Sequence, residues 1–439
     1  MPAATNILFH RASTVRARSA RRRWLVAVTA LGVAAGSRAA IADDRLLAPA
    51  AETAPDTAPD TAPDTAAPDG EGVEIGVAPL IGGDTDHGFG AGALGSIAMF
   101  DRDHTPYRWK VEFAAFYAVK SSFTDPSYVD IYARIIYPQL LNKRLRLEVR
   151  PSYTKETALG YYGIGNRPVQ PQDFDAKRDT YDRLHPSVGI TTLWQAGHDF
   201  ELLFGARYAY NRIAFDPAST LAQEAMETPH DLDAPHGVVL IEGGVVFDSR
   251  DNEIAPGSGQ HHMLKLRVSP RAGDALPYGY QQLNATARVY QTIVPRYLVL
   301  AVRAVFDVQL GDVPFYEMSR YEETSAIGGS QGVRGVPSYR FYGRVKAFGN
   351  LELRSEVRRF RWLSRPFIFG VAAFYDVGRL WSDIKRSRPD LDGTGLGLHY
   401  GVGGGLRLQK GRSFLLRADV AWSPDARPIG VYVAANHAF

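Results

Sequence analysis

Apolar and polar side chains alternate with a period of two over most of the chain. In residues 143–152, Leu145, Leu147 and Val149 alternate with arginine and glutamate, and residues 350–358 repeat the pattern. Successive side chains of a β-strand point to opposite faces, so each segment predicts a strand with one apolar face and one densely charged face. No segment of this repeating region has the 18 uncharged apolar residues that would indicate a membrane-spanning helix.

Segments of this kind occupy nearly all of the chain after residue 72. A soluble β protein would turn its apolar faces inward, but few helical stretches are present to cover so many strands. A membrane barrel resolves this difficulty, because its apolar side chains face lipid and its charged side chains face a wet lumen. The pattern therefore predicts an all-β protein, a transmembrane antiparallel β-barrel of about sixteen strands. The predicted strands cover residues 73–81, 88–100, 107–119, 127–137, 143–156, 180–194, 198–213, 236–248, 259–269, 279–293, 296–310, 342–358, 364–378, 396–409, 413–423 and 428–439.

Aromatic residues and loop lengths distinguish the ends of the predicted barrel. Aromatic side chains lie toward strand ends on the apolar faces, as in the interfacial girdles of membrane barrels. The longest connections, 157–179, 214–235, 311–341 and 379–395, all follow odd-numbered strands and so share one side. We expect that side to be extracellular, because periplasmic turns are short in such barrels. The girdle residues are Tyr107, Trp109, Tyr137, Tyr208, Tyr210 and Trp422.

The first 72 residues have a different composition. Three consecutive arginines end at Arg23, an apolar run extends from Trp24 to Ala35, and an Ala-Ile-Ala triplet ends at Ala42. This order predicts a secretory signal peptide over residues 1–42, because the apolar run is too short to span a bilayer. Residues 43–72 carry a Thr-Ala-Pro-Asp repeat, which predicts an extended, disordered linker. The barrel then occupies residues 73–439, and we expect it in the bacterial outer membrane.

The charge distribution excludes one class of partner. The chain has 50 basic and 47 acidic residues, but seven arginines and no acidic residues precede Ala42. Without that segment the chain has a net charge of −4. Nucleic-acid binding needs a basic surface, so no nucleic-acid partner is expected. The absence of cysteine also excludes disulfides, thiolate metal sites and cysteine nucleophiles.

One loop carries the most informative motif. Residues 328–335, Gly-Gly-Ser-Gln-Gly-Val-Arg-Gly, resemble the sixth-loop motif of the BamA/TamA outer-membrane assembly and translocation superfamily. The core of that motif is Val-Arg-Gly followed by an aromatic residue. Here Val336 replaces the aromatic residue, and Tyr339 and Phe341 follow closely.

Three further segments resemble the same superfamily in order and position. Residues 247–252 are similar to its turn between strands eight and nine, residues 350–354 to its strand twelve, and residues 374–378 to its strand thirteen. Residues 161–166, Tyr-Tyr-Gly-Ile-Gly-Asn, are also similar. The resemblance therefore covers residues 236–439 most clearly, and it identifies a barrel domain of the bacterial surface antigen type.

The resemblance implies that the sixth extracellular loop folds back into the lumen. Its arginine would then meet acidic groups, so that Arg334 pairs with Asp376 and lies near Glu352. The period of two independently places Glu352 on the charged face of its strand, and a planar guanidinium matches a carboxylate bidentately. The alternative is that these charges only line a wet channel. The predicted site residues are Val333, Arg334, Gly335, Glu352, Asp376 and Gly378.

The final residue, Phe439, suggests partners for the protein. An aromatic residue that closes the last predicted strand resembles the signal by which the bacterial barrel-assembly machinery recognises its clients, although His437 is atypical of that signal. The other expected partners are outer-membrane lipid, lipopolysaccharide and a separate periplasmic protein.

The segment before the barrel departs from the family pattern. Family members carry periplasmic POTRA domains there, and residues 43–72 are too few for one, so we expect a barrel without POTRA domains. Three functions stay open: protein or lipid insertion or translocation with a separate periplasmic partner, diffusion through a porin, and a structural surface antigen.

Two patterns invite a prediction of catalysis or metal binding. The sequence Gly-Gly-Ser-Gln-Gly at Ser330 matches the nucleophile elbow of serine hydrolases, with His399, His437 and Asp376 as candidate partners. No helix is predicted after it, so a lipid hydrolase ranks behind insertion or translocation and behind the porin or surface-antigen alternative, and the chain is predicted not to be an enzyme. His261 and His262 are adjacent on a strand and would point to opposite faces, so no metal site and no cofactor are predicted.

A cluster of glycines in residues 401–405 is the last candidate for a binding site. It lacks the spacing of a dinucleotide loop, so we expect its glycines to permit bending or close packing of the loop. The glycines are Gly401, Gly403, Gly404 and Gly405.

Overall fold

The computed structural model describes residues 71–84, 88–119, 126–168, 173–226, 230–295, 297–322, 324–411, 414–425 and 429–439. The predicted signal peptide lies outside the described residues, as does the predicted linker apart from Glu71 and Gly72.

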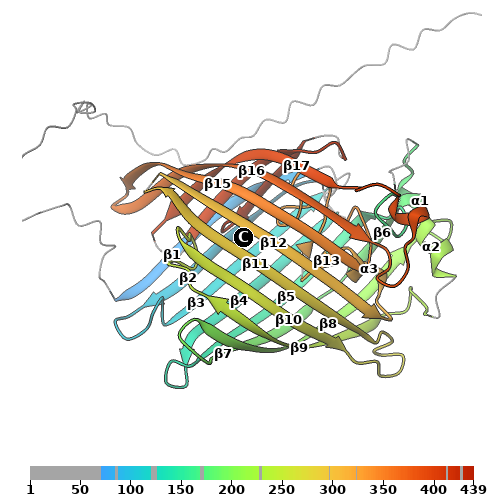
Figure 1. Ribbon diagram of the computed structural model, residues 1–439, viewed down its shortest axis with the longest axis horizontal. Helices are drawn as coiled ribbons and strands as arrows, with labels where there is room; N and C mark the ends of the chain where they lie inside the picture. The colour runs from blue at the N-terminus through green and yellow to red at the C-terminus, as the bar shows by residue number, and fades with distance from the viewer. Residues whose placement is uncertain are drawn as a thin grey trace, which may run out of the picture. The chain divides into compact units, whose positions relative to one another are not determined.

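Seventeen strands form one antiparallel sheet, which curls into a barrel (Figure 1). Neighbouring strands along the chain pair with each other, and β12 pairs with β15 across a long loop. β6 and β7 together fill one position, because both pair with β5 on one side and β8 on the other. The predicted all-β fold of about sixteen strands is therefore confirmed. The strands are β1 (Gly72–Asp84), β2 (Gly88–Phe100), β3 (Trp109–Val119), β4 (Tyr128–Leu140), β5 (Leu145–Gly160), β6 (Thr180–Leu184), β7 (Ser187–Gln195), β8 (Phe200–Phe215), β9 (His236–Asp248), β10 (Gly259–Ser269), β11 (Tyr280–Val294), β12 (Leu298–Gly311), β15 (Val345–Trp362), β16 (Arg365–Trp381), β17 (His399–Lys410), β18 (Phe414–Trp422) and β19 (Gly430–Ala435).

At two places a single residue interrupts or ends a predicted strand. The strand predicted over 180–194 is interrupted at Pro186, which has no N–H group with which to continue the ladder. The last strand does not run to Phe439 as predicted: β19 ends at Ala435, and Asn436 adopts a left-handed conformation with a φ of 62°. The chain then leaves the wall, and Phe439 is buried.

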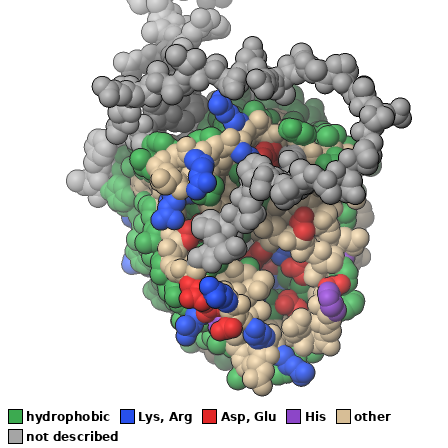
Figure 2. Space-filling model, turned by 90° about the vertical axis from the view of Figure 1, so that its left-hand side faces the viewer, with side chains coloured by type: hydrophobic (Ala, Val, Ile, Leu, Met, Phe, Trp, Pro, Cys, Tyr) green, Lys and Arg blue, Asp and Glu red, His purple; other side chains and the backbone are tan. Residues whose placement is uncertain are grey.

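The two faces of the wall have inverted polarity. On β10, the apolar Leu264 and Leu266 are exposed, whereas Lys265 and Arg267 between them are buried. Figure 2 views the end with the short turns, where hydrophobic side chains cover the outer flank and acidic side chains lie in the hollow interior. This inversion is typical of a sheet with lipid outside and a polar lumen inside.

The first and last strands meet by packing rather than by a ladder. Among the described residues, no backbone pairing joins β1 to β19. Instead, Ala78 and Leu80 of β1 share a buried cluster with Phe414 of β18. The ammonium group of Lys410 also donates to the carbonyl of Ile75 at 2.8 Å.

Short helices lie in the long connections. They are α1 (Ala176–Asp179), α2 (Thr220–Ala225), α3 (Phe315–Met318) and α4 (Pro389–Asp392), and the two-residue strands β13 (Arg320–Tyr321) and β14 (Thr324–Ser325) form a separate hairpin. Within the described part of the chain, no helix has both the length and the apolar character needed to cross a membrane.

Candidate functional site

The connection between β12 and β15, residues 312–344, folds inside the barrel, and we call it the lumen loop. Its side chains Ile327, Val333 and Val336 form a buried cluster with Phe348 of β15 and Leu380 of β16. Because these wall residues face inward, the lumen loop fills part of the interior.

Arg334 joins the lumen loop to the wall, and its side chain is fully buried. Its Nε and Nη2 atoms donate to the two carboxylate oxygens of Asp376 at 2.7 and 3.0 Å, which makes a bidentate pair. Its Nη1 atom donates to Glu352 at 2.9 Å and to Asp419 at 3.1 Å. The guanidinium carbon lies 3.4 Å from the ring centre of Phe374. One cation of the lumen loop therefore contacts three carboxylates of the wall.

Further arginines of the wall balance these carboxylates. Arg407 of β17 donates to Glu352 at 3.1 Å and to Asp419 at 2.5 Å. Arg417 of β18 donates to Asp419 at 2.8 Å, and Arg354 of β15 donates to Glu352 at 3.0 Å. Buried charges are costly unless they are paired and hydrogen-bonded, so the network depends on every member. We call Arg334, Glu352, Arg354, Asp376, Arg407, Arg417 and Asp419 the lumen network.

Sequence reasoning missed Asp419, Arg407 and Arg417. Their alternation with apolar neighbours does indicate an inward face, since Arg417 and Asp419 are two residues apart on one strand. That pattern gives the face of each strand, but it does not give the height at which the lumen loop meets the wall.

The other predicted loop residues lie at the same contact. Val333 packs beside Gly378, where an added Cβ would lie 3.1 Å from a methyl group of Val333. Gly335 has a φ of 96°, and its N–H donates to the hydroxyl of Tyr432 on β19 at 2.9 Å. The loop is thereby linked to β15, β16, β18 and β19.

Replacing Tyr432 with phenylalanine should lower the free energy of unfolding by about 1–2 kcal/mol, because the N–H of Gly335 would lose its acceptor. Urea unfolding of the folded barrel in detergent measures this loss. Tyr375→Phe is the matched control, since the ring of Tyr375 is exposed on the outer face. Equal losses in the two variants would contradict the assignment.

Residues 161–166 give the lumen loop a second attachment. The N–H of Gly165 donates to the carbonyl of Tyr342 at 2.7 Å. The amide of Asn166 donates to the carbonyl of Gly397 at 2.7 Å and accepts from the N–H of Leu380 at 3.1 Å. This segment thus joins the lumen loop to β16 and to the connection that follows it.

Phe439 lies inside the barrel, not on the wall. Its ring shares a buried cluster with Tyr290 of β11 and Ala301 of β12. The guanidinium carbons of Arg303 and Arg354 lie 4.9 and 5.2 Å from its ring centre. Arg354 thus contacts both the lumen network and Phe439.

The turn between β9 and β10 also reaches into the barrel. Glu253 of this turn accepts a hydrogen bond of 2.7 Å from Arg146 of β5, and Arg250 pairs with Asp248 at 2.6 Å. Burial alone would raise the pKa of Glu253, but Arg146, with Arg134 and Lys110 nearby, outweighs burial and holds that pKa well below its usual range. The carboxylate of Glu253 is therefore ionised, and its ion pair with Arg146 attaches the turn to β5.

The predicted hydrolase residues are engaged separately. Asp376 binds Arg334, and His399 bonds to Asp425 at 3.0 Å while its ring stacks on Phe341. His437 lies 3.8 Å from Glu352. Among the described residues, no hydrogen bond joins Ser330 to either histidine, and its carbonyl accepts from Arg417.

His261 and His262 lie on opposite faces of β10. His261 is opposite Asp248 in the ladder, whereas His262 stacks on Phe247 at a ring distance of 5.9 Å. In the described ranges, no group of three or more potential ligands could hold a metal ion.

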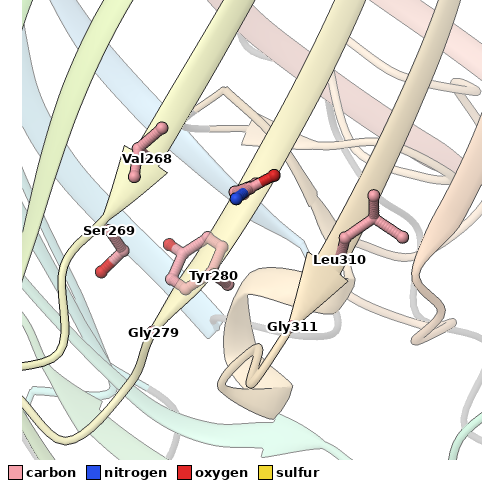
Figure 3. Close-up of a pocket in the computed structure, with 7 residues that line it drawn as sticks. Val268, Ser269, Gly279, Tyr280, Leu310 and Gly311 are labelled. Carbon is pink, nitrogen blue, oxygen red and sulfur yellow. The ribbon is translucent and has the colours of Figure 1, made fainter.

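A pocket of about 220 Å³ lies where β10, β11 and β12 approach the long loops (Figure 3). Its lining residues are Val268, Ser269, Gly279, Tyr280, Gln281, Leu310 and Gly311, and Gln281 is the ladder partner of both Val268 and Leu310. None of its lining residues belongs to the lumen network, so the candidate site is the attachment of the loop to the wall.

An apolar exterior and a polar, loop-filled interior define an outer-membrane β-barrel. The Omp85 superfamily domain matches residues 96–430, and the chain therefore belongs to the Omp85 superfamily. The resemblance drawn from the loop motif is confirmed.

Solved structures agree with this assignment at the level of the fold. The crystal structure of BamA from Haemophilus ducreyi lacking POTRA domains 1-3 is similar, with a TM-score of 0.51, 12% identity and coverage of 83% of this chain and 70% of that chain. CdiB from Escherichia coli has a TM-score of 0.50, 12% identity and coverage of 83% and 62%, so this chain spans less than two thirds of CdiB. The comparison with curated proteins gave no match.

Proposed function

We propose that this chain takes part in inserting or translocating proteins at the outer membrane. The observation that carries the proposal is the attachment of the lumen loop to the wall through Arg334, which is fully buried. A diffusion pore needs an open lumen, whereas here a loop is held across the interior by charge-assisted hydrogen bonds. Membership in the Omp85 superfamily and the similarity to BamA and CdiB support the same function.

A diffusion porin is the second candidate. Charged inward side chains such as Lys265 and Arg267 of β10 are typical of aqueous channels, although here both are buried and Lys265 is paired with Glu322 of the lumen loop at 2.5 Å. A catalytic role has less support, since Ser330 is not joined to a histidine among the described residues.

The two ends of the chain and the outer face of the barrel have further roles in this proposal. Residues 1–42 would direct export through the inner membrane, and residues 43–72 would form an extended linker through which a separate periplasmic partner is recruited. Phe439 would act before folding, as the signal read by the barrel-assembly machinery, because its ring is buried in the finished barrel. Outer-membrane lipid and lipopolysaccharide would surround the outer face.

Channel recordings in planar bilayers distinguish the two candidates. We expect small, flickering conductance for the wild type, because the lumen loop obstructs the pore. A large and steady open channel would favour the porin instead. A second measurement follows the folding of an unfolded outer-membrane protein into vesicles with and without this barrel; an unchanged folding rate would contradict a role in insertion.

Deleting residues 43–72 tests the recruitment of a partner. Pull-downs from envelope extracts should recover a periplasmic protein with the complete chain and lose it with the deletion variant. The heat-modifiability of both proteins on gels verifies that each barrel is folded.

A further inference from the structure

The hairpin of β15 and β16 extends beyond β12 on one side, whereas on the other side β16 pairs with β17 as far as Phe367. The two strands of the hairpin have 18 and 17 residues, although a tilted strand needs only about 9–11 to cross a bilayer. β12 pairs with β15 only as far as Ser355, yet β15 and β16 pair on to Trp362 and Arg365. The strand predicted over residues 342–358 therefore continues to Trp362, and we call residues 356–369 the hairpin tip.

A bulge decides which side chains of the hairpin tip face outward. The register shifts between Glu356, opposite Gly370, and Arg358, opposite Phe369. Cross-strand partners share a face, and inward residues of β16 have even numbers, as buried Phe374 and Asp376 show. The outward face of the tip consequently consists of the pairs Arg358 with Phe369, Phe360 with Phe367, and Trp362 with Arg365.

This outward face combines stacked rings with arginines. Phe360 stacks on Phe367 at 5.5 Å with an interplanar angle of 14°, and Trp362 lies 5.8 Å from Phe367. Within the described residues, Arg358 and Arg365 have no ion-pair partner. On the opposite face, by contrast, Arg359 is paired with Glu356.

The outward face of the hairpin tip continues the exposed apolar surface of the wall. Leu351 and Leu353 point outward on the same strand, each 42% exposed. Lys and Arg side chains are visible on the rim of the short-turn end (Figure 2). Aromatic rings favour the depth of the lipid headgroups, and each arginine near a membrane surface attracts anionic lipid.

We propose that the outward face of the hairpin tip binds the phosphate headgroups of anionic phospholipids in the leaflet at the short-turn end. Arg358 and Arg365 would contact the phosphates, while Phe360, Trp362 and Phe367 rest among the upper acyl carbons. This inference requires only that the barrel spans a membrane, so it is independent of the proposed role in insertion or translocation.

Trp362 provides a local reporter, because it is opposite Arg365. The chain is folded into phosphatidylcholine vesicles that contain an equal fraction of dibrominated phosphatidylglycerol or dibrominated phosphatidylcholine, and quenching of tryptophan fluorescence is recorded. The chain has six tryptophans, so subtraction of the Trp362→Phe spectrum isolates this signal. Dibrominated phosphatidylglycerol should be enriched around Trp362 over dibrominated phosphatidylcholine by about fivefold per arginine, and it should quench the Trp362 fluorescence more strongly.

Two double variants carry the same change in charge on opposite faces. Arg358→Gln with Arg365→Gln should bring the preference close to unity, whereas Arg359→Gln with Arg361→Gln should retain it. Equal quenching by both lipids in the wild type, or equal losses in the two variants, would overturn the proposal. Displacement of the lipid by a synthetic acidic peptide of residues 43–70 would also overturn it, in favour of a protein partner. If the first double variant does not fold, Arg365→Gln alone is measured.

Discussion

Replacing Arg334 with alanine is expected to lower the free energy of unfolding of the barrel by about 3–5 kcal/mol, the usual consequence of removing one partner from a buried ion pair. Asp376 would lose two hydrogen bonds, and Glu352 and Asp419 one each. Freed from these contacts, the lumen loop should leave the wall, so we also expect larger and longer channel openings. Urea unfolding, heat-modifiability on gels and planar-bilayer recordings measure these effects.

The control for Arg334→Ala is an arginine in an exposed pair. Arg388 lies 3.0 Å from Asp390, and their side chains are 47% and 61% exposed, so Arg388→Ala should leave the free energy of unfolding nearly unchanged. Unchanged heat-modifiability together with unchanged conductance in Arg334→Ala would refute the role of Arg334 in holding the loop.

Replacing Gly401 with alanine should displace the lumen loop without removing any charge. A methyl group at Gly401 of β17 would overlap the backbone carbonyl oxygen of Arg334. Since the overlap involves backbone, the loop or the strand must shift, at a cost of about 3 kcal/mol. We expect the channel to resemble that of Arg334→Ala, although the lumen network keeps all of its members.

Gly243→Ala on β9 is the matched control for Gly401→Ala. Its added methyl group would make only an ordinary contact of 3.9 Å with the carbonyl of Leu203. A loss of stability in Gly243→Ala equal to that in Gly401→Ala would show that any methyl group in the wall is disruptive. Normal conductance in Gly401→Ala would contradict the close approach of loop and wall.

The sequence predicted the wall well because the period of two is a direct consequence of strand geometry. Alternation at Leu351, Glu352 and Leu353 gave the correct inward face, and only Glu352 of these three is buried. It failed at Pro186 and Asn436, where one residue interrupts the ladder or reverses the chain. Beyond Glu356 a bulge exchanges the faces of β15, and alternation cannot show a bulge.

The partners of Arg334 in the lumen network were only partly predictable, because alternation gives the face of a strand and not its position relative to distant strands. The position of Arg334 in a Val-Arg-Gly motif suggested its carboxylate partners on β15 and β16, where the structure places them. Asp419 lies 85 residues from Arg334 in the chain, and no local pattern joins them. Their contact depends on how far each strand is shifted along its neighbour, which is a property of the complete sheet.

The position of the loop contacts along the chain has a consequence for the order of assembly. Arg334 reaches Asp419 on β18, and Gly335 reaches Tyr432 on β19, so the loop precedes its own partners by many residues. Contacts of such long range slow folding, because the intervening chain must first be ordered. A chain that has inserted only its first strands has no means of holding the loop, and the interior is sealed by the same step that completes the wall. Pairing of the final strands is thus also the event that fixes the loop in the interior.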